Sequence, residues 1–321
     1  MSQLVFDEVS VHYGSRRRGL TAVDRVSLTV PAGATVGLVG ESGSGKSTLA
    51  RTAVGLSPVS AGRVLLDTTD VREFSRGHRP LQMVFQDPYS SLDPRMSIGE
   101  SITETVPRGA VTGAAAKRAE VRRLLELVQL DPDRADMLPA QLSGGQRQRV
   151  ALARALAGRP RVVIADEITS ALDVSVQGAV LNLVRDVQRE MKLTMLFISH
   201  NLAVVRYLSD IVAVMHLGRI VEVGPTEQVL GDPRHPYTRT LLEAVPQRHV
   251  PLLDGFQDTT TEPVDPRHPP SGCRYRTLCP IGPEAHAEPA ERELCVTTDP
   301  VAGAERRPHH AACHFAGTRP A

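Results

Sequence analysis

The sequence predicts an α/β fold built on a mostly parallel β-sheet, followed by a small cysteine-containing extension. Short apolar runs alternate with helical segments over most of the chain, and polar or glycine-rich residues directly follow several of these runs. Such alternation is typical of a parallel sheet covered on both faces, in which ligands bind at the carboxyl ends of the strands. All four cysteines lie between positions 273 and 313, which indicates a separate local unit.

Composition sets the first limits on function. The chain has 321 residues, 41% hydrophobic and 23% charged, which suits one large domain and a smaller one. Its net charge of +1 gives no support to nucleic-acid binding. The basic run 16–18 is interpreted as a solvated loop. No apolar run reaches bilayer-spanning length and the N-terminus lacks a signal peptide, so we expect a chain kept in the cytoplasm.

The expected elements follow from apolar periodicity along the chain. Strands are predicted at 4–11, 22–30, 35–39, 62–67, 81–85, 162–167 and 194–198, with a hairpin over 211–223 that turns at Leu217-Gly218. Residues from about 87 to 157 are predicted to form a mostly helical insertion. In it Val121, Leu124, Leu125 and Val128 share one helix face, and Asp131-Pro132 ends that helix. Further helices are expected at 147–157, 174–190 and shortly after 235, and residues 246–272 are expected to be irregular.

A glycine-rich stretch lies between the run 35–39 and a helical segment. It matches the phosphate-binding pattern G-x-x-x-x-G-K-[ST] and consists of Gly40, Glu41, Ser42, Gly43, Ser44, Gly45, Lys46, Ser47 and Thr48. The glycines let backbone N–H groups turn toward phosphate oxygens, and the helix N-terminus adds partial positive charge. We predict a nucleoside triphosphate site in which Lys46 contacts the β- and γ-phosphates and Ser47 binds Mg²⁺.

Two carboxylates end the apolar run 162–165. Asp166 can hold Mg²⁺ directly or through water, and Glu167 can polarise a water for attack on the γ-phosphate. Two solvent-exposed carboxylates at a strand end are the alternative interpretation. The phosphate-binding loop upstream argues against that alternative.

A second glycine turn precedes the helix at 147–157. It consists of Ser143, Gly144, Gly145 and Gln146 after Leu142. The Ser143 side chain, the backbone N–H groups and the helix dipole can bind an anion, although the turn has no lysine. A helix capped by Ser143 explains the same residues, and the residues alone support both interpretations.

Taken together, these motifs resemble the ATP-binding subunits of ABC transporters. Residues 142–149 are similar to the family's signature motif, and Gln86, His200 and Tyr13 match its Q-loop, its switch histidine and the aromatic residue that stacks on adenine. Ser170-Ala171-Leu172-Asp173 matches the D-loop, whose acidic residue is Asp173. The motifs follow the family order over residues 4–235, and without that order Tyr13 and His200 would be read as ordinary packing or polar residues.

The resemblance implies an architecture and a set of roles. The fold would be a P-loop NTPase with a RecA-like core, an N-terminal antiparallel β subdomain and the helical insertion at 87–157. Residues 1–235 would form the nucleotide-binding domain and 236–321 a C-terminal extension. Glu167, His200 and Gln86 would be catalytic, and Gln86 would join Ser47 and Asp166 around Mg²⁺. ATP would be sandwiched between the phosphate-binding loop of one subunit and Ser143–Gln146 of another.

One departure and one further likeness refine this expectation. Ile168 stands where the family usually has proline after the catalytic glutamate, which changes a turn, and we expect activity to be retained. His235-Pro236-Tyr237-Thr238 with Val245-Pro246 resembles the C-terminal extension of oligopeptide, dipeptide and nickel importers, and residues 86–96 are most similar to the dipeptide-type ATPases. A helix that docks this extension on the core is compatible with that interpretation.

The cysteines Cys273, Cys279, Cys295 and Cys313 are spaced C-x5-C-x15-C-x17-C. A cytoplasmic location disfavours disulfides, and zinc ribbons usually contain C-x2-C pairs, which this spacing lacks. Irregularly spaced thiols suit an iron–sulfur cluster, and the tail resembles importers of which some carry a 4Fe-4S cluster. Zinc is the second interpretation and free thiols the third. His309, His310 and His314 are interpreted as solvated tail residues that could substitute as ligands.

We therefore expect an ATP-hydrolysing subunit of an ABC importer for peptides, nickel or another small solute. It would be a peripheral protein at the cytoplasmic face of the cell membrane. Its partners would be two permease subunits, a second ATPase (a paralogue in preference to a second copy) and, indirectly, an extracytoplasmic substrate-binding protein, with no nucleic acid. The alternatives are a soluble ATPase of this type acting on nucleic acid or ribosomes, and an iron–sulfur-regulated ATP switch.

Overall fold

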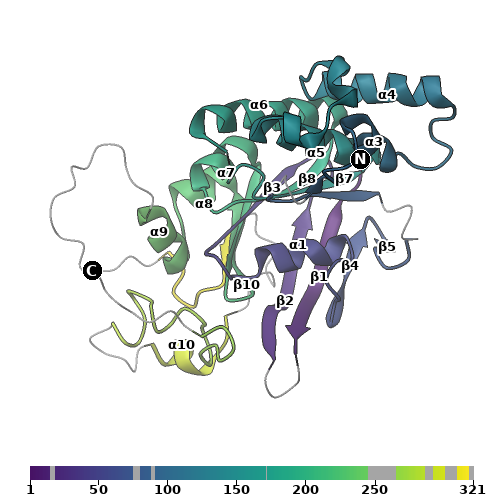
Figure 1. Cartoon of the computed structure of the whole chain (residues 1–321). Coiled ribbons are helices and arrows are strands. Elements are labelled where there is room, and N and C mark those ends of the chain that lie inside the picture. The colour runs from purple at the N-terminus through teal and green to yellow at the C-terminus, as the bar shows by residue number, and fades with distance from the viewer. Residues whose placement is uncertain are drawn as a thin grey trace.

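The computed structural model describes residues 1–14, 19–74, 80–87, 91–170, 172–244, 265–285, 292–300 and 309–317, which form two sheets with surrounding helices (Figure 1). The smaller sheet is antiparallel, with the order β2-β1-β4-β5. Its strands are β1 (Leu4–Tyr13), β2 (Leu20–Val30), β4 (Ala61–Leu66) and β5 (Thr69–Asp70). The predicted N-terminal antiparallel subdomain is thus present.

The larger sheet carries the buried parallel strands. Its order is β11-β10-β9-β3-β8-β7-β6. The strands are β3 (Thr35–Val39), β6 (Leu81–Val84), β7 (Val162–Asp166), β8 (Thr194–Ile198), β9 (Ile211–His216), β10 (Arg219–Pro225) and β11 (His310–Ala311). β6, β7, β8, β3 and β9 run parallel, so the carboxyl ends of these strands lie at one edge of the sheet. β10 and β11 are antiparallel additions.

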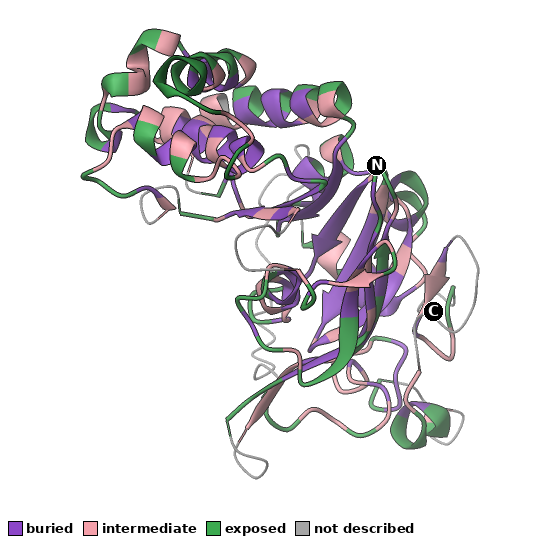
Figure 2. Cartoon of the chain, turned by 90° about the vertical axis from the view of Figure 1, so that its right-hand side faces the viewer, coloured by how far each residue is buried: buried purple, intermediate pink, exposed green. Residues whose placement is uncertain are grey.

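Successive side chains of each parallel strand point to opposite faces of the sheet, so the interior is divided into two cores. In β8, Met195 and Phe197 pack among α5 (Gly144–Ala157), α6 (Val174–Met191) and α7 (Leu202–Leu208). Leu196 and Ile198 face α1 (Lys46–Ala53) and the antiparallel sheet. All residues of β3, β7 and β8 are consequently buried, as Figure 2 shows for the centre of the molecule. The predicted cover on both faces is thus present: helices supply one cover, and α1 and the antiparallel sheet supply the other.

The helical insertion contains α3 (Ile98–Glu104), α4 (Ala114–Leu127), two 3-10 turns (Pro132–Asp136 and Pro139–Gln141) and α5. Val121, Leu124, Leu125 and Val128 are buried, which confirms the predicted face. The predicted end at Asp131-Pro132 is wrong, since α4 ends at Leu127 and Gln129 takes a left-handed φ of 56°. Pro132 instead begins a 3-10 turn, where its missing N–H has no cost.

The C-terminal part returns to the main sheet. It comprises α8 (Thr226–Gly231), α9 (Pro236–Glu243), α10 (Glu293–Thr297) and β11, which pairs with β10. The division at 235/236 stays a prediction.

The predicted strands 35–39 and 194–198 and the turn at Leu217-Gly218 are confirmed. Arg16–Arg18, residues 88–90, Ala171 and residues 246–264 of the segment expected to be irregular (246–272) lie outside the described residues. Among the helices that are described, none has the length and apolarity to cross a bilayer.

Candidate functional site

The phosphate-binding loop connects β3 to α1 and is packed too closely for side chains at two of its glycines. A Cβ on Gly40 would lie 2.1 Å from the carbonyl oxygen of Met215, and one on Gly45 would lie 2.2 Å from that of Ala22. Both glycines also have positive φ, 150° and 104°. Only glycine combines this backbone with this proximity, so the loop's shape depends on both positions.

Lys46 is the first residue of α1 and is buried against the loop. Its Nζ donates to the carbonyl oxygens of Gly40 (2.8 Å) and Glu41 (2.6 Å) and to Ser44 Oγ (3.3 Å). Burial lowers the pKa of Lys46, and the nearby carboxylates of Glu167 and Asp166 oppose that shift. The ammonium group thus lies in the curve of the loop, where a phosphate would provide the anionic partner.

The end of β7 lies beside the start of α1. Ser47 Oγ donates to Asp166 Oδ1 at 3.0 Å, and Asp166 is 3% exposed. Burial raises the pKa of Asp166, the hydrogen bond from Ser47 opposes this shift, and Glu167 adds to it. A nearby cation favours the ionised form of a buried carboxylate.

These two oxygens fit Mg²⁺ by chemistry. The ion prefers hard oxygen ligands and usually takes few from protein, with the remainder from water and phosphate. The hydroxyl of Ser47 and the carboxylate of Asp166 are adjacent and stand next to the loop that would hold the phosphates.

Glu167 and His200 meet across the ends of β7 and β8. His200 Nδ1 lies 3.2 Å from Glu167 Oε1, and the Glu167 N–H donates to the Ile198 carbonyl at 3.0 Å. Glu167 has a φ of 46°, a left-handed conformation that is strained for a non-glycine residue and concentrated at functional sites. The Glu167 side chain faces His200, which is exposed. Ile168 points into the core instead.

Gln86 joins the same edge through the segment after Glu167. Its Nε2 donates to Ser170 Oγ at 3.3 Å, and Ser170 Oγ donates to the Glu167 carbonyl at 2.9 Å. The structure thus brings together the loop, Asp166, Glu167, His200 and Gln86. Their chemical roles remain proposals.

The second glycine turn begins α5 and packs on the predicted D-loop. Ser143 caps α5 reciprocally with Gln146: the Gln146 N–H donates to Ser143 Oγ (3.4 Å), and the Ser143 N–H donates to Gln146 Oε1 (3.0 Å). A Cβ on Gly145 would lie 2.4 Å from Val176, and one on Gly144 would lie 3.6 Å from Leu172. The exposed Asp173 precedes α6. Within the described chain no hydrogen bond or ion pair connects Ser143–Gln146 to the phosphate-binding loop.

Tyr13 lies near the end of β1, away from this edge. Its side chain is 40% exposed, and its hydroxyl lies 3.0 Å from Ser57 Oγ, beyond the far end of α1. The exposed ring leaves an aromatic surface available. Its predicted contact with adenine stays a prediction.

The four cysteines line one small cavity in the C-terminal extension, together with His235, Tyr275 and His314. Burial raises the pKa of Cys273, Cys279 and Cys313 to about 11, and it also raises that of Cys295. All four thiols are free. In the described residues, no three His, Cys, Asp or Glu side chains converge as they would around one metal ion.

His309 corrects the expectation of solvated tail histidines. It is buried, and its Nε2 lies 2.7 Å from Glu222 Oε1. Glu222 is itself fully buried and accepts from the N–H groups of Arg234 (2.7 Å) and His235 (3.0 Å). A buried carboxylate requires such partners. Since Glu222 belongs to β10 and its partners come from the C-terminal part, these bonds hold that part against β10.

Sequence reasoning did not identify Tyr237 as a neighbour of the phosphate-binding loop. The Glu41 N–H donates to the Tyr237 hydroxyl at 3.0 Å across 196 positions of sequence. The sequence indicates Tyr237 only as part of the tail motif. No local pattern encodes a contact over this separation.

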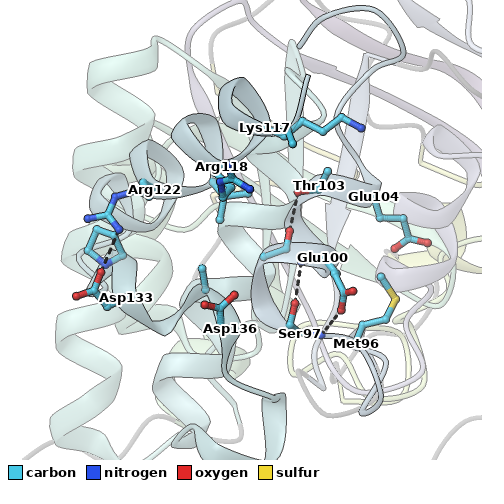
Figure 3. Close-up of a pocket in the computed structure, with 15 residues that line it drawn as sticks. Met96, Ser97, Glu100, Thr103, Glu104, Lys117, Arg118, Arg122, Asp133 and Asp136 are labelled. Atoms are coloured by element: carbon cyan, nitrogen blue, oxygen red, sulfur yellow. Dashed lines mark hydrogen bonds and ion pairs between the residues drawn. The ribbon is translucent and has the colours of Figure 1, made fainter. Parts of the chain in front are cut away.

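A large pocket lies in the helical insertion, between α3, α4 and the 3-10 turn at Pro132–Asp136 (Figure 3). Its volume is about 820 Å³. Acidic Glu100, Glu104 and Asp136 and basic Lys117 and Arg118 lie around it. It is therefore a mixed-charge surface depression, distinct from the nucleotide edge.

Comparisons with known proteins agree with this arrangement. Two family models match: "ABC transporter" over residues 23–170 and "Oligopeptide/dipeptide transporter, C-terminal region" over residues 221–285. The oligopeptide transport ATP-binding protein OppF of Salmonella typhimurium is 42% identical over 88% of this chain and 84% of its own. The di/tripeptide transport ATP-binding protein DppF of Pseudomonas aeruginosa is 42% identical over 82% and 83%. The ATP-binding cassette MJ0796, solved as a dimer in a post-hydrolysis state with ADP and Pi, has a TM-score of 0.61 and 27% identity, covering 70% of this chain and 98% of its own.

The buried carboxylate generates a prediction about stability. Because the folded-state pKa of Asp166 is raised, its ionisation disfavours the folded state above that pKa, and the penalty disappears at pH values below its unfolded pKa. We expect Asp166→Asn to increase the free energy of unfolding near neutral pH, without nucleotide or Mg²⁺, and to lose this advantage in acid. Urea denaturation across pH measures the difference. A gap that widens toward low pH contradicts the prediction.

Proposed function

Because this chain belongs to the ATP-binding subunits of the ABC transporter family, we propose that it hydrolyses ATP to power peptide uptake across the cytoplasmic membrane. The observation that carries the chemistry is the continuous set of contacts from Lys46 through Ser47 and Asp166 to Glu167 and His200. The peptide cargo is supported by the printed names of the relatives and by the match to the oligopeptide/dipeptide transporter tail.

Hydrolysis in this proposal depends on positioning and on charge. Lys46 and the loop N–H groups would hold the β- and γ-phosphates, and Ser47 and Asp166 would hold Mg²⁺, whose charge would offset that of the phosphates. Glu167 orients and polarises the attacking water, and His200, hydrogen-bonded to it, contacts the γ-phosphate. Gln86, which is hydrogen-bonded to Ser170, would sense the same group. Bound phosphate and Mg²⁺ would also balance the buried charges of Lys46 and Asp166.

We propose that the active unit contains two ATPase subunits. Within the described residues of one chain the Ser143–Gln146 turn has no hydrogen bond to the phosphate-binding loop, and in this proposal a second subunit supplies such a turn opposite ATP. The dimeric state of the solved cassette MJ0796 supports this arrangement. The D-loop residue Asp173, packed beside the turn through Leu172, would lie at the same interface. A paralogue is proposed as the partner.

The pocket in Figure 3 is the proposed contact for the permease subunits. It lies in the insertion that follows Gln86, so a segment bound there is connected in sequence to the γ-phosphate sensor. Its mixed charges suit a polar cytoplasmic segment of a membrane protein. The chain would thus lie peripherally at the cytoplasmic face of the membrane, with an extracytoplasmic binding protein choosing the solute. The relatives' names favour this function over an ATPase that acts on nucleic acid or ribosomes.

For the extension we propose a 4Fe-4S cluster bound by Cys273, Cys279, Cys295 and Cys313. The support is that all four thiols line one cavity. A cluster offers a separate iron to each thiolate, so its ligands need not converge on one point as they must around zinc. Raised thiol pKa values mean that binding would release protons. The cluster would be structural or regulatory.

Glu167→Gln tests the hydrolytic role. We expect ATP binding to persist and phosphate release to fall by about 100-fold or more, since a positioned general base typically contributes that much. Equilibrium ATP binding and steady-state phosphate release measure the two effects. The control is Glu126→Gln on the exposed side of α4, which should behave like the parent. Unchanged hydrolysis in Glu167→Gln would refute the assignment.

A gentle anaerobic pull-down of the tagged chain from its own membranes tests the transport function. We expect recovery of two multi-spanning proteins and a second ATPase, identified by mass spectrometry. Arg118→Glu in the pocket should reduce recovery of the multi-spanning proteins, whereas Arg63→Glu on the antiparallel sheet should not. Recovery of ribosomal or DNA-bound partners instead would overturn the transport proposal and leave the ATPase chemistry standing.

Cys279→Ser tests the cluster. We expect the anaerobically purified variant to contain less iron and to unfold at a lower temperature, because one cluster ligand is lost. Iron analysis and thermal unfolding measure this, with Thr297→Ser in α10 as the control from the same extension. If Cys279→Ser contains as much iron as the parent, or if neither protein contains iron, the cluster hypothesis is wrong.

A further inference from the structure

We propose that Tyr237 is a positioning residue for the phosphate-binding loop, and that through it the C-terminal extension sets the affinity for ATP. The inference rests on the proposed ATPase function, because it concerns the loop that would hold the nucleotide. Its starting point is the hydrogen bond from the Glu41 N–H to the Tyr237 hydroxyl, 3.0 Å long. Nothing in the proposed hydrolytic chemistry requires this bond.

The bond fixes the peptide unit between Gly40 and Glu41. The two ends of this planar group have different partners: the Gly40 carbonyl accepts from Lys46 Nζ at 2.8 Å, and the Glu41 N–H donates to Tyr237. Rotation of the plane would therefore move the carbonyl that holds the ammonium group. Gly40, with a φ of 150°, offers little resistance of its own to such rotation. Tyr237 supplies that resistance.

Tyr237 can act as an anchor because it is itself immobilised. It is 1% exposed, its ring centroid lies 4.3 Å from that of His216 and 5.4 Å from that of Tyr275, and its N–H donates to His235 Nδ1 at 3.0 Å. His216 ends β9, and in the following turn the Gly218 N–H donates to the Ser44 carbonyl at 2.9 Å. The phenol and this turn thus support the loop together.

The anchor is continuous with the four-cysteine cavity. His235 and Pro236, which directly precede Tyr237, line that cavity, and so does Tyr275, which packs on its ring. Arg274, next to Tyr275, donates to the Leu217 carbonyl in the turn that supports the loop. Packing in the extension is therefore transmitted to the Gly40–Glu41 peptide through groups in direct contact.

Tyr237→Phe tests the proposal, with Tyr275→Phe as the matched control. Each variant removes one buried hydroxyl from the same aromatic cluster, but the Tyr275 hydroxyl bonds Thr240 at 3.0 Å and not the loop. For Tyr237→Phe in the purified full chain we expect the Kd and KM for ATP to rise about two- to tenfold, the range that a lost hydrogen bond gives. We expect kcat to change by less than about twofold, because the groups that act on water are untouched.

A structural role alone would give a different pattern. Both variants would then lower the unfolding temperature and leave the Kd for ATP at the parent's value, which would overturn the proposal. Equal weakening of ATP binding in both variants would also overturn it. Lys46→Ala separates this failure from failure of the proposed function. If the parent does not bind ATP and Lys46→Ala changes nothing, the proposed nucleotide site is wrong. If the parent binds ATP and Tyr237→Phe binds it equally well, the nucleotide site stands and only the proposed role of Tyr237 is wrong.

Discussion

Two carbonyl groups confine the phosphate-binding loop, and the arrangement of the nucleotide edge depends on this confinement. The Met215 carbonyl comes from β9 of the main sheet and the Ala22 carbonyl from β2 of the antiparallel sheet. The loop therefore lies where the two sheets approach each other, and only glycine at 40 and 45 allows that approach. With the loop held, Lys46 and Ser47 occupy a defined position at the start of α1, next to the end of β7.

The edge beside the loop holds charge and strain at a cost to stability. Lys46 and Asp166 are buried, and burial lowers the pKa of Lys46 and raises that of Asp166, which favours the neutral form of each. Glu167 has a strained backbone. Such features are unfavourable for an isolated folded chain and favourable for one that binds a highly charged ligand. The same burial that raises the cost strengthens each electrostatic contact once phosphate and Mg²⁺ are present.

Polar contacts attach the C-terminal extension to the two sheets, in addition to the packing of its buried residues Tyr237, Cys273 and Tyr275 in the main core. Arg219 and Arg274 both pair with Asp24 of β2, and Arg219 also pairs with Asp299. Burial would raise the pKa of Asp24, but the arginines outweigh it and lower that pKa, so the carboxylate stays charged. With β11 on β10 and the buried Glu222–His309 pair, these contacts hold the extension on the main sheet. They also place Tyr237 against the loop.

Features that depend on local pattern could be predicted from the sequence. Buried strands such as 35–39 and 194–198, the capped turn at Ser143 and the phosphate-binding loop follow from apolar runs, helix caps and glycine spacing, all of which act within a few residues. The convergence of Asp166, Glu167 and His200 was also predictable, because parallel strands present their carboxyl ends at one edge. Tertiary structure alone decided that a sheet covers one face, that His309 is buried on Glu222, and that Tyr237 bonds Glu41. Those contacts join residues far apart in sequence, and they depend on how whole elements pack, which local periodicity does not encode.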